Sequence, residues 1–310
     1  MIGQDLLTIE NLEVRYGETP VLQSVSLALQ AGSILGIVGE SGSGKSTLLL
    51  ATMGILGRKG SIQDGRIIYQ GTDLLQLSAE KMRRIRGKEI ALIMQNPNSS
   101  FCPVRKIKHQ LHEAVRSHGD LSGSEADRRM LELLARMNLP DGKRIMNSYA
   151  FQMSGGMCQR TAIAVAMVLR PQLLLADEPT SALDVTVQAQ VIKEIMNLRT
   201  EFGTSVVIVS HNMGVISHMA DQIAVMYGGL ILEYGVKDEI IGNPAHRYTQ
   251  NIIRAIPRLG APAPRGIAVF QHERRTQGCP VQKSCPNYAD QCLTKTPPLK
   301  EISKGHFLRC

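Results

Sequence analysis

Apolar and polar positions alternate at the start of the chain, and the pattern changes along it. The segment LTIENLEVRY (7–16) alternates as a half-buried strand does. Two further strands, VSLALQAG (25–32) and SILGIVG (33–39), are predicted on either side of a glycine turn. The apolar stretch LLLATMGIL (48–56) then predicts a buried helix. The first part of the chain is thus expected to be mostly β-structure with one buried helix.

The region from residue 96 to about residue 149 has a different pattern, in which long charged stretches follow a helical period. SGSEADRRMLELLARMNL (122–139) is an example. Ser124, with Asp127 in the first turn, is predicted to cap this helix. The region is therefore expected to be a helical insert between two parts of a sheet.

Apolar strands flank the insert and alternate with helices. EIALIMQ (89–95) precedes it, and three strands follow it, each after a helical stretch: QLLLAD (172–177), SVVIVS (205–210) and QIAVMYGG (222–229). Strands that alternate with helices predict a largely parallel sheet with helices on both faces. The predicted fold class is therefore α/β.

Composition narrows the class of protein. The 310 residues suffice for one large domain with an appendage, and 43% hydrophobic residues support a sizeable core. No stretch approaches the roughly 18 uninterrupted apolar residues of a membrane helix, and the first ten residues lack the features of a secretory signal. The chain is therefore expected in the cytoplasm, where a cysteine cluster favours a metal site over disulfides.

Residues 256–310 differ in composition from the rest of the chain. They hold nine Lys or Arg and three Asp or Glu, and thus most of the net charge of +8. Such a charge can meet nucleic acid or anionic lipid, although a solvated basic surface is the favoured interpretation. PRLGAPAPRG (257–266) is predicted to be a linker, which places a domain boundary near residue 255.

GESGSGKST (39–47) fits the pattern G-x-x-x-x-G-K-[ST] of a phosphate-binding loop, between a predicted strand and a predicted helix. Its glycines let backbone N–H groups turn inward onto phosphate oxygens. Lys45 is predicted to reach the β- and γ-phosphates of ATP, and the Ser46 hydroxyl to bind Mg²⁺. The predicted ATP-binding residues of this loop are Gly39, Glu40, Ser41, Gly42, Ser43, Gly44, Lys45, Ser46 and Thr47.

LLLADE (173–178) is predicted to form a buried strand that brings two carboxylates to its C-terminal end. Open parallel sheets bind their ligands at that edge. Asp177 is placed to hold Mg²⁺, directly or through water. Glu178 is placed to polarise the water that attacks the γ-phosphate. Together with the loop, these residues predict an enzyme that hydrolyses ATP with Mg²⁺.

Further motifs carry a resemblance to the ATP-binding cassette (ABC) ATPases. MSGGMCQR (153–160) resembles the signature motif of that family, and SALD (181–184) resembles its D-loop. Three single residues match the family's other motifs: Gln95 is similar to the Q-loop glutamine, His211 to the switch histidine and Tyr16 to the aromatic residue that stacks on adenine. The motifs follow the family's order and cover most of the chain.

The resemblance implies a domain organisation. Residues 1–255 would form the nucleotide-binding domain, with a P-loop core of mixed, largely parallel sheet and flanking helices, an antiparallel β subdomain, and a helical subdomain at about 96–155. Residues 256–310 would form the Pro-rich linker and a small Cys-rich extension. Two cassettes would bind head to tail, with each ATP between the phosphate loop of one and the signature of the other.

The resemblance also implies roles for single residues. His211 would contact the γ-phosphate within its own subunit, and Gln95 would couple Mg²⁺ and the attacking water to the helical insert. The remaining implied residues are Asp184 of the D-loop and, touching the partner's ATP, Ser154, Gly155, Gly156 and Met157. Three positions depart from the commonest family pattern: Met157, Cys158 and Asn212. Of these, Cys158 is interpreted as a small residue on a helix surface.

AVMYGG (224–229) and NPAHRYTQNIIRAIP (243–257) resemble the dipeptide/oligopeptide/nickel importer branch of the family. This implies an ATPase subunit bound peripherally to the cytoplasmic face of the membrane. Its implied partners are a second, distinct ATPase chain, two transmembrane permeases and an extracytoplasmic substrate-binding protein. Di- or oligopeptides are the predicted cargo, and nickel or a nickel–metallophore complex is the alternative because IMQNP (93–97) resembles the nickel branch.

An alternative of a different class is a soluble ABC ATPase that acts on nucleic acid, which a basic tail would suit. Such proteins generally carry two cassettes or coiled-coil insertions, whereas this chain has one cassette and a short insert. A scaffold without catalysis is disfavoured, because the predicted catalytic residues are intact. No nucleic acid partner is therefore expected.

Four cysteines occur in the tail with the spacing C-x5-C-x6-C-x17-C: Cys279, Cys285, Cys292 and Cys310. Four thiolates in a reducing compartment suit a [4Fe–4S] cluster or Zn²⁺. Zinc ribbons usually have closer pairs, and the peptide branch of the resembled family is thought to carry a cluster. A structural [4Fe–4S] cluster is therefore the prediction, with Zn²⁺ or cysteines without metal as alternatives.

Overall fold

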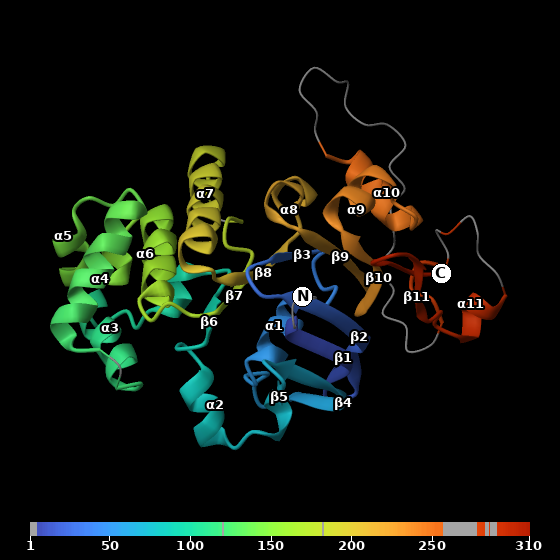
Figure 1. Ribbon diagram of the computed structural model, residues 1–310, viewed down its shortest axis with the longest axis horizontal. Coiled ribbons are helices and arrows are strands. Elements are labelled where there is room, and N and C mark those ends of the chain that lie inside the picture. The colour runs from blue at the N-terminus through green and yellow to red at the C-terminus, as the bar shows by residue number, and fades with distance from the viewer. Residues whose placement is uncertain (1–4, 120, 182, 257–277, 283–284, 286–289) are drawn as a thin grey trace. The chain divides into compact units, whose positions relative to one another are not determined.

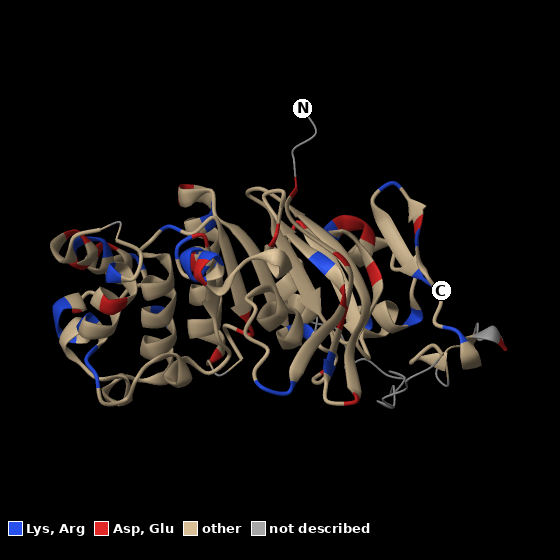
Figure 2. Cartoon of the chain, turned by 90° about the horizontal axis from the view of Figure 1, so that it is seen from below, with Lys and Arg blue, Asp and Glu red and all other residues tan. Residues whose placement is uncertain are grey.

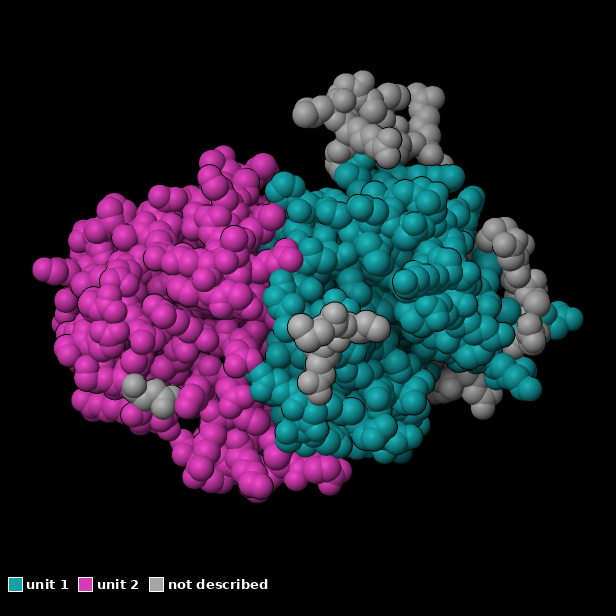
Figure 3. Space-filling model, in the orientation of Figure 1, with its two compact units in different colours: residues 1–75, 209–310 teal, residues 76–208 magenta. Residues whose placement is uncertain are grey.

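The computed structural model of the chain describes residues 5–119, 121–181, 183–256, 278–282, 285 and 290–310. It divides into two compact units, coloured separately in Figure 3. The first unit comprises residues 1–75 and 209–310, and the second comprises residues 76–208. The chain therefore starts and ends in the first unit. Figure 1 labels the helices and strands of both units.

The first unit begins with an antiparallel sheet in the strand order β2-β1-β4-β5. Alternation in β1 turns one face inward, where Leu7 pairs with Leu29 of β2 and with Tyr69 of β4. The register shifts where Asn11 has a φ of 48°, a conformation that asparagine tolerates. The strands are β1 (Asp5–Tyr16), β2 (Thr19–Gln30), β4 (Gly60–Tyr69) and β5 (Thr72–Asp73). The predicted antiparallel β subdomain is confirmed.

The first unit also contains the strands of a second sheet, in the order β11-β12-β10-β9-β3. β3 and β9 are parallel, and the other neighbouring pairs are antiparallel. The strands are β3 (Ile34–Val38), β9 (Gln222–Tyr227), β10 (Leu230–Val236), β11 (Leu299–Ser303) and β12 (His306–Arg309). The helices of this unit are α1 (Lys45–Thr52), α8 (Met213–Met219), α9 (Lys237–Gly242), α10 (Arg247–Arg254) and α11 (Gln291–Thr294).

The C-terminal hairpin of β11 and β12 extends this sheet, as Figure 1 shows beside β10. Phe307 pairs with Tyr234 of β10, and their rings stack with centroids 5.7 Å apart. Because of this pairing, His306 and Arg309 are buried in the first unit. The tail thus shares the core of the cassette. The predicted linker, residues 257–266, lies outside the described residues.

The second unit combines two parallel strands with the predicted helical insert. β6 (Ile90–Ile93) pairs with β7 (Leu173–Asp177) in parallel, which agrees with the predicted α/β class. The helices are α2 (Ala79–Ile85), α3 (Ile107–Arg116), α4 (Gly123–Arg136), α5 (Gly142–Asn147), α6 (Gly155–Met167) and α7 (Val185–Phe202), with 3₁₀ turns η2 (Pro97–Ser100) and η3 (Ala150–Gln152). The turn η1 (Leu74–Gln76) and the buried strand β8 (Ser205–Ser210) lie where the chain passes between the units.

Charges of both signs are interspersed over the helices of the second unit, as Figure 2 shows. On α4, Arg128 and Arg129 both bind Glu125 one turn away, at 2.8 and 3.0 Å. Met130 and Leu134 lie on the opposite face of α4 and are fully buried. The charged positions of the helical pattern therefore lie on the outer face of α4, and partly exposed ion pairs of this kind add little stability.

The predicted cap of α4 is wrong by two residues. Ser122 is the N-cap, and its hydroxyl accepts a hydrogen bond of 3.2 Å from the N–H of Glu125. Asp127, expected to support the helix start, instead binds Lys108 at 2.6 Å and His112 at 2.7 Å, both on α3. Tertiary partners on α3 thus decide the role of this carboxylate.

The interpretation of Cys158 as a helix-surface residue is also wrong. Cys158 lies in α6 and is fully buried, because α6 packs against α4 and the turn η2. Burial raises the pKa of its thiol to about 11. Cys158 is therefore a small core residue.

Candidate nucleotide site

The predicted phosphate loop links β3 to α1 in the first unit. Gly44, the N-cap of α1, has a φ of 102°, a conformation that residues with a side chain rarely adopt. A Cβ there would lie 2.7 Å from the Leu22 side chain and 2.9 Å from the Val21 carbonyl oxygen. A Cβ on Gly39 would overlap the Met226 carbonyl. The glycines therefore let the loop pass close to β2 and β9, as a phosphate cradle requires.

Lys45 is the first residue of α1 and is only 5% exposed. Its ammonium donates to the carbonyl oxygens of Gly39 at 2.9 Å and Glu40 at 2.8 Å. It also lies 3.4 Å from the hydroxyl of Ser43. These bonds hold a positive charge inside the loop, at the N-terminal end of a helix. The arrangement suits an anion with several acceptor oxygens.

The end of β7 brings together two of the predicted catalytic residues. The strand is buried throughout, and Asp177 is 6% exposed. Glu178 follows it with a φ of 43°, and its carboxylate accepts a hydrogen bond of 3.1 Å from the side-chain amide of Gln95. Ser181 donates to the Glu178 carbonyl oxygen from both its N–H and its hydroxyl, each over 3.2 Å. The turn therefore holds the backbone of Glu178, and Gln95 orients its carboxylate.

The predicted signature begins α6 in the second unit. The hydroxyl of Ser154 caps the helix by accepting from the N–H of Met157 at 3.3 Å. Nothing lies within 4 Å of a Cβ built on Gly155, whereas one on Gly156 would lie 3.1 Å from Val187. Asp184 caps α7 by accepting from the N–H groups of Thr186 and Val187. The signature and the D-loop thus form two capped helix starts that meet at Val187.

His211 follows β8 in the first unit and is exposed. The next residue, Asn212, caps α8 by accepting from the N–H of Gly214 at 2.9 Å and of Val215 at 3.4 Å. Asparagine makes this cap as well as the aspartate more usual in the family. The departure from the family pattern therefore leaves the helix start next to His211 intact.

Tyr16 ends β1 and is half-buried. It pairs with Gly60 of β4, and a Cβ on that glycine would lie 3.1 Å from the Tyr16 ring. The small residue thus leaves room for the ring. The side chain has the shape and position for stacking on a base, and its adenine role remains a prediction.

The predicted site residues are divided between the two units. The first unit carries Tyr16, the phosphate loop and His211, and the second carries Gln95, Asp177, Glu178, the signature and the D-loop. One residue in contact with the loop was missed: Tyr248 of α10, whose phenol oxygen accepts a hydrogen bond from the N–H of Glu40 at 3.3 Å. Its signal in the sequence was a lone aromatic residue in an otherwise polar stretch, HRYTQN.

The cysteines of the tail lie near one another without forming a recognisable metal site. The N–H of Cys279 donates to the carbonyl oxygen of Cys292 at 2.8 Å. Burial raises the pKa of the Cys279 thiol, and the thiols of Cys285, Cys292 and Cys310 raise it further. In the described part of the chain, no three His, Cys, Asp or Glu side chains converge closely enough to hold a metal ion. The structure therefore gives no support to the iron–sulfur or zinc predictions.

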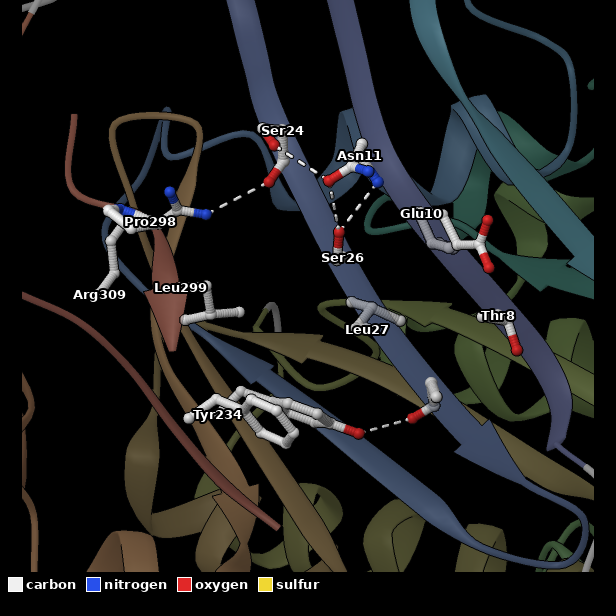
Figure 4. Close-up of a pocket in the computed structure, with 13 residues that line it drawn as sticks. Thr8, Glu10, Asn11, Ser24, Ser26, Leu27, Tyr234, Pro298, Leu299 and Arg309 are labelled. Atoms are coloured by element: carbon white, nitrogen blue, oxygen red, sulfur yellow. Dashed lines mark hydrogen bonds between the residues drawn. The ribbon is translucent and has the colours of Figure 1, made fainter. Parts of the chain in front are cut away.

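A hollow of about 440 Å³ lies between the C-terminal hairpin and the strands β1 and β2, as Figure 4 shows. Along one wall, the hydroxyls of Ser24 and Ser26 both donate to the side-chain oxygen of Asn11, and the Asn11 N–H donates to Ser26. Arg309 crosses one end and donates to the carbonyl oxygens of Ser24 at 3.3 Å and Ile231 at 2.8 Å. Burial lowers the pKa of this guanidinium. The arginine thus ties the hairpin to both sheets of the first unit.

Comparison with known proteins identifies the class. A sequence profile described as ABC transporter matches residues 22–181, more than half of the chain. The chain therefore belongs to the ABC transporter family and is an ATP-binding cassette ATPase, as the resemblance predicted. A second profile, described as oligopeptide/dipeptide transporter, C-terminal region, matches residues 232–292.

Individual relatives within the ABC transporter family are named for peptide transport. The chain is 39% identical to a probable peptide ABC transporter ATP-binding protein, y4tR, of Sinorhizobium fredii, over 98% of this chain and 94% of that protein. It is 36% identical to the oligopeptide transport ATP-binding protein OppD of Escherichia coli, over 98% of this chain and 92% of that protein. The nickel prediction gains no support from these relatives.

Solved structures confirm the fold. The dimeric bacterial ABC transporter cassette MJ0796 matches with a TM-score of 0.66 at 27% identity, over 74% of this chain and 98% of that chain. A dimeric post-hydrolysis state of the same cassette, bound to ADP and Pi, matches with a TM-score of 0.65 at 28% identity. None of the described helices has both the length and the apolar character that crossing a membrane requires.

Proposed function

We propose that this chain is the ATP-hydrolysing subunit of an importer for di- or oligopeptides. The contact between Gln95 and Glu178 carries the catalytic part of the proposal, because it aims a carboxylate from the end of a strand that also delivers Asp177. The cargo is supported by the match of residues 232–292 to the oligopeptide/dipeptide transporter region and by relatives named for peptide transport.

In this proposal the phosphates of ATP bind the N-terminus of α1, where backbone N–H groups and Lys45 balance their charge. Tyr16 stacks on the adenine, and His211 contacts the γ-phosphate. Ser46, Gln95 and Asp177 present hydroxyl, amide and carboxylate oxygens, the donor types that suit Mg²⁺. The ion would supply positive charge to the β- and γ-phosphate oxygens.

Glu178 takes a proton from a water molecule while the water oxygen attacks the γ-phosphorus. The bond from that phosphorus to the bridging oxygen breaks, and ADP and phosphate result. Gln95 holds the Glu178 carboxylate in the required direction. Ser154 and the glycines after it, at the start of α6, present N–H groups to an ATP bound by a partner cassette.

The partners follow from this arrangement. A signature that serves another cassette's ATP requires a second ATPase subunit, for which a distinct chain is proposed. An importer also requires two permease subunits and an extracytoplasmic substrate-binding protein, with this chain peripheral on the cytoplasmic side of the membrane.

For the tail we propose that Cys279, Cys285, Cys292 and Cys310 hold a [4Fe–4S] cluster with a structural role. The proposal rests on the donor chemistry of four free thiols in one segment of the chain. As they lie in the structure, the thiols do not converge on one point. No catalytic step is assigned to the cluster.

Transport in vesicles tests the proposal. The chain, coexpressed with its candidate permeases and second ATPase, should drive ATP-dependent uptake of a labelled tripeptide when the binding protein is added. The Glu178→Gln subunit in the same complex serves as the matched control and should give no uptake. Uptake of nickel without uptake of peptide would contradict the proposed cargo.

A further inference from the structure

A buried tyrosine of α10 contacts the phosphate loop from the side of the protein core. Tyr248 is 1% exposed, and its phenol oxygen accepts a hydrogen bond of 3.3 Å from the backbone N–H of Glu40. Its ring packs edge-on against Tyr227 of β9, with centroids 4.8 Å apart and planes at 62°. This packing leaves the hydroxyl directed at the loop.

The peptide unit that joins Gly39 to Glu40 is held at both ends. Its N–H donates to Tyr248, and its carbonyl oxygen accepts from the ammonium of Lys45 at 2.9 Å. Because a trans peptide is planar, its N–H and carbonyl point in opposite directions and can only turn together. The bond to Tyr248 therefore fixes the acceptor that orients Lys45.

The start of α10 fixes Tyr248 in turn. The N–H of Tyr248 donates to Nδ1 of His246, the N-cap of the helix, at 3.0 Å. The N–H groups of Ala245 and His246 donate to the two carboxylate oxygens of Glu233, at 2.7 and 3.0 Å. Glu233 lies in β10 and is fully buried. The strand thus sets the position of the helix start.

The C-terminal hairpin provides a third partner for the same carboxylate. Nε2 of His306 in β12 lies 2.7 Å from a carboxylate oxygen of Glu233. A continuous series of hydrogen bonds therefore runs from His306 through Glu233, His246 and Tyr248 to Glu40. All of these residues belong to the first unit.

We propose that Tyr248 is a positioning residue for the ATPase reaction. It holds the peptide between Gly39 and Glu40 in the orientation that places Lys45 for ATP, and the C-terminal hairpin supports it through His306 and Glu233. The inference rests on the proposed role of Lys45 in binding ATP. It gives the C-terminal region a part in nucleotide binding that does not depend on a metal.

The Tyr248→Phe variant tests this, because it removes only the phenol oxygen. The KM for ATP should rise about three- to tenfold, as expected for the loss of one hydrogen bond, while kcat stays within about twofold. Tyr234→Phe is the matched control: Tyr234 is also buried, and its hydroxyl donates to the Ala28 carbonyl at 2.8 Å, away from the loop. This control should lose thermal stability and keep its KM. An unchanged KM in Tyr248→Phe, or an equal rise in both variants, overturns the inference.

A double-mutant cycle with Lys45→Ala separates the inference from the proposed function. If Tyr248 acts through Lys45, adding Tyr248→Phe to Lys45→Ala should cause no further loss of ATP affinity. Additive losses would show that Tyr248 acts by another route and would overturn the inference. If Lys45→Ala alone leaves ATP affinity unchanged, the proposed role of Lys45 fails, and the inference fails with it.

The contribution of the C-terminal hairpin to ATP binding is measured with His306→Ala in the full-length chain. Its KM for ATP should rise in the same direction as in Tyr248→Phe, and the combined variant should be no worse than Tyr248→Phe alone. Thermal unfolding of each variant confirms that the chain stays folded. A normal KM in a folded His306→Ala protein would show that the hairpin does not help to position Tyr248.

Discussion

The side-chain amide of Gln95 donates a hydrogen bond of 3.1 Å to the carboxylate of Glu178, across 83 residues of sequence. Gln95 comes after β6 and Glu178 directly after β7, and these strands are parallel neighbours, so their C-terminal ends lie at one edge. The positive φ of Glu178 is unfavourable for a residue with a side chain, and the two hydrogen bonds from Ser181 to its carbonyl oxygen hold the turn in this conformation. A base whose direction is fixed in advance is what attack by water requires.

Replacing the proposed base, Glu178, should block hydrolysis without blocking binding. Glu178→Gln is expected to slow ATP turnover at least about 100-fold, because the carboxylate that accepts the proton is lost. ATP should then accumulate in a closed cassette dimer, which size-exclusion chromatography with ATP would detect. Glu125→Gln, a change of a half-buried carboxylate on α4, serves as a control and should leave turnover unaltered. Wild-type turnover in Glu178→Gln would show that another group is the base.

Removing the charge of the phosphate loop should weaken nucleotide binding. Lys45→Ala is expected to lower ATP affinity about 10- to 100-fold, because a buried ammonium that would bind phosphate oxygens is lost. Titration calorimetry measures the dissociation constant. Lys59→Ala, which removes an exposed lysine of the same unit, should bind ATP normally. Equal ATP affinity in both variants would rule out the proposed role of Lys45 in binding the phosphates.

The buried cap of α10 should make stability depend on pH. Burial lowers the pKa of His246 from 6.5 to about 4, so the folded chain keeps this imidazole neutral while the unfolded chain protonates it. This contribution to the free energy of unfolding is fully present above pH 6.5. It should fall as the pH drops from about 6.5 to 4, by up to about 3 kcal/mol.

His246→Asn isolates this contribution, because asparagine keeps an acceptor for the N–H of Tyr248 and does not titrate. Urea unfolding at pH 7, 6 and 5 should show that the free energy of unfolding of this variant depends less steeply on pH. The difference in slope should correspond to up to one fewer proton taken up on unfolding. The same pH slope in both proteins would mean that His246 is protonated in the folded chain as well.

The cysteine tail makes a separate prediction. Anaerobically purified protein should contain iron and sulfide and absorb broadly near about 400 nm if the four thiols hold a cluster. Substituting Ser for Cys279, which is buried, should remove both signals and lower the thermal stability of the tail. Metal analysis that finds only zinc, or no metal, would refute the cluster. Cys158→Ser, outside the tail, should leave the iron content unaltered.

The sequence by itself determined the parts of the site that depend on local geometry. The glycines of residues 39–44 and the lysine after them specify a phosphate loop, because positive φ and close packing exclude other residues there. A run of apolar residues before Asp177 likewise predicts a buried strand that ends in carboxylates. Gln95 was found through the family resemblance, and its bond to Glu178 needed the parallel pairing of two distant strands.

Only the tertiary structure decided which residues support that site. Tyr248 lies about 200 residues from the loop that it contacts, and no local period relates the two. The burial of Cys158 and the role of Asp127 followed from packing between helices, and the docking of the tail followed from pairing between β10 and β12. Local motifs encode backbone shape and chemistry, whereas burial and long-range hydrogen bonds arise only when distant segments pack into one core.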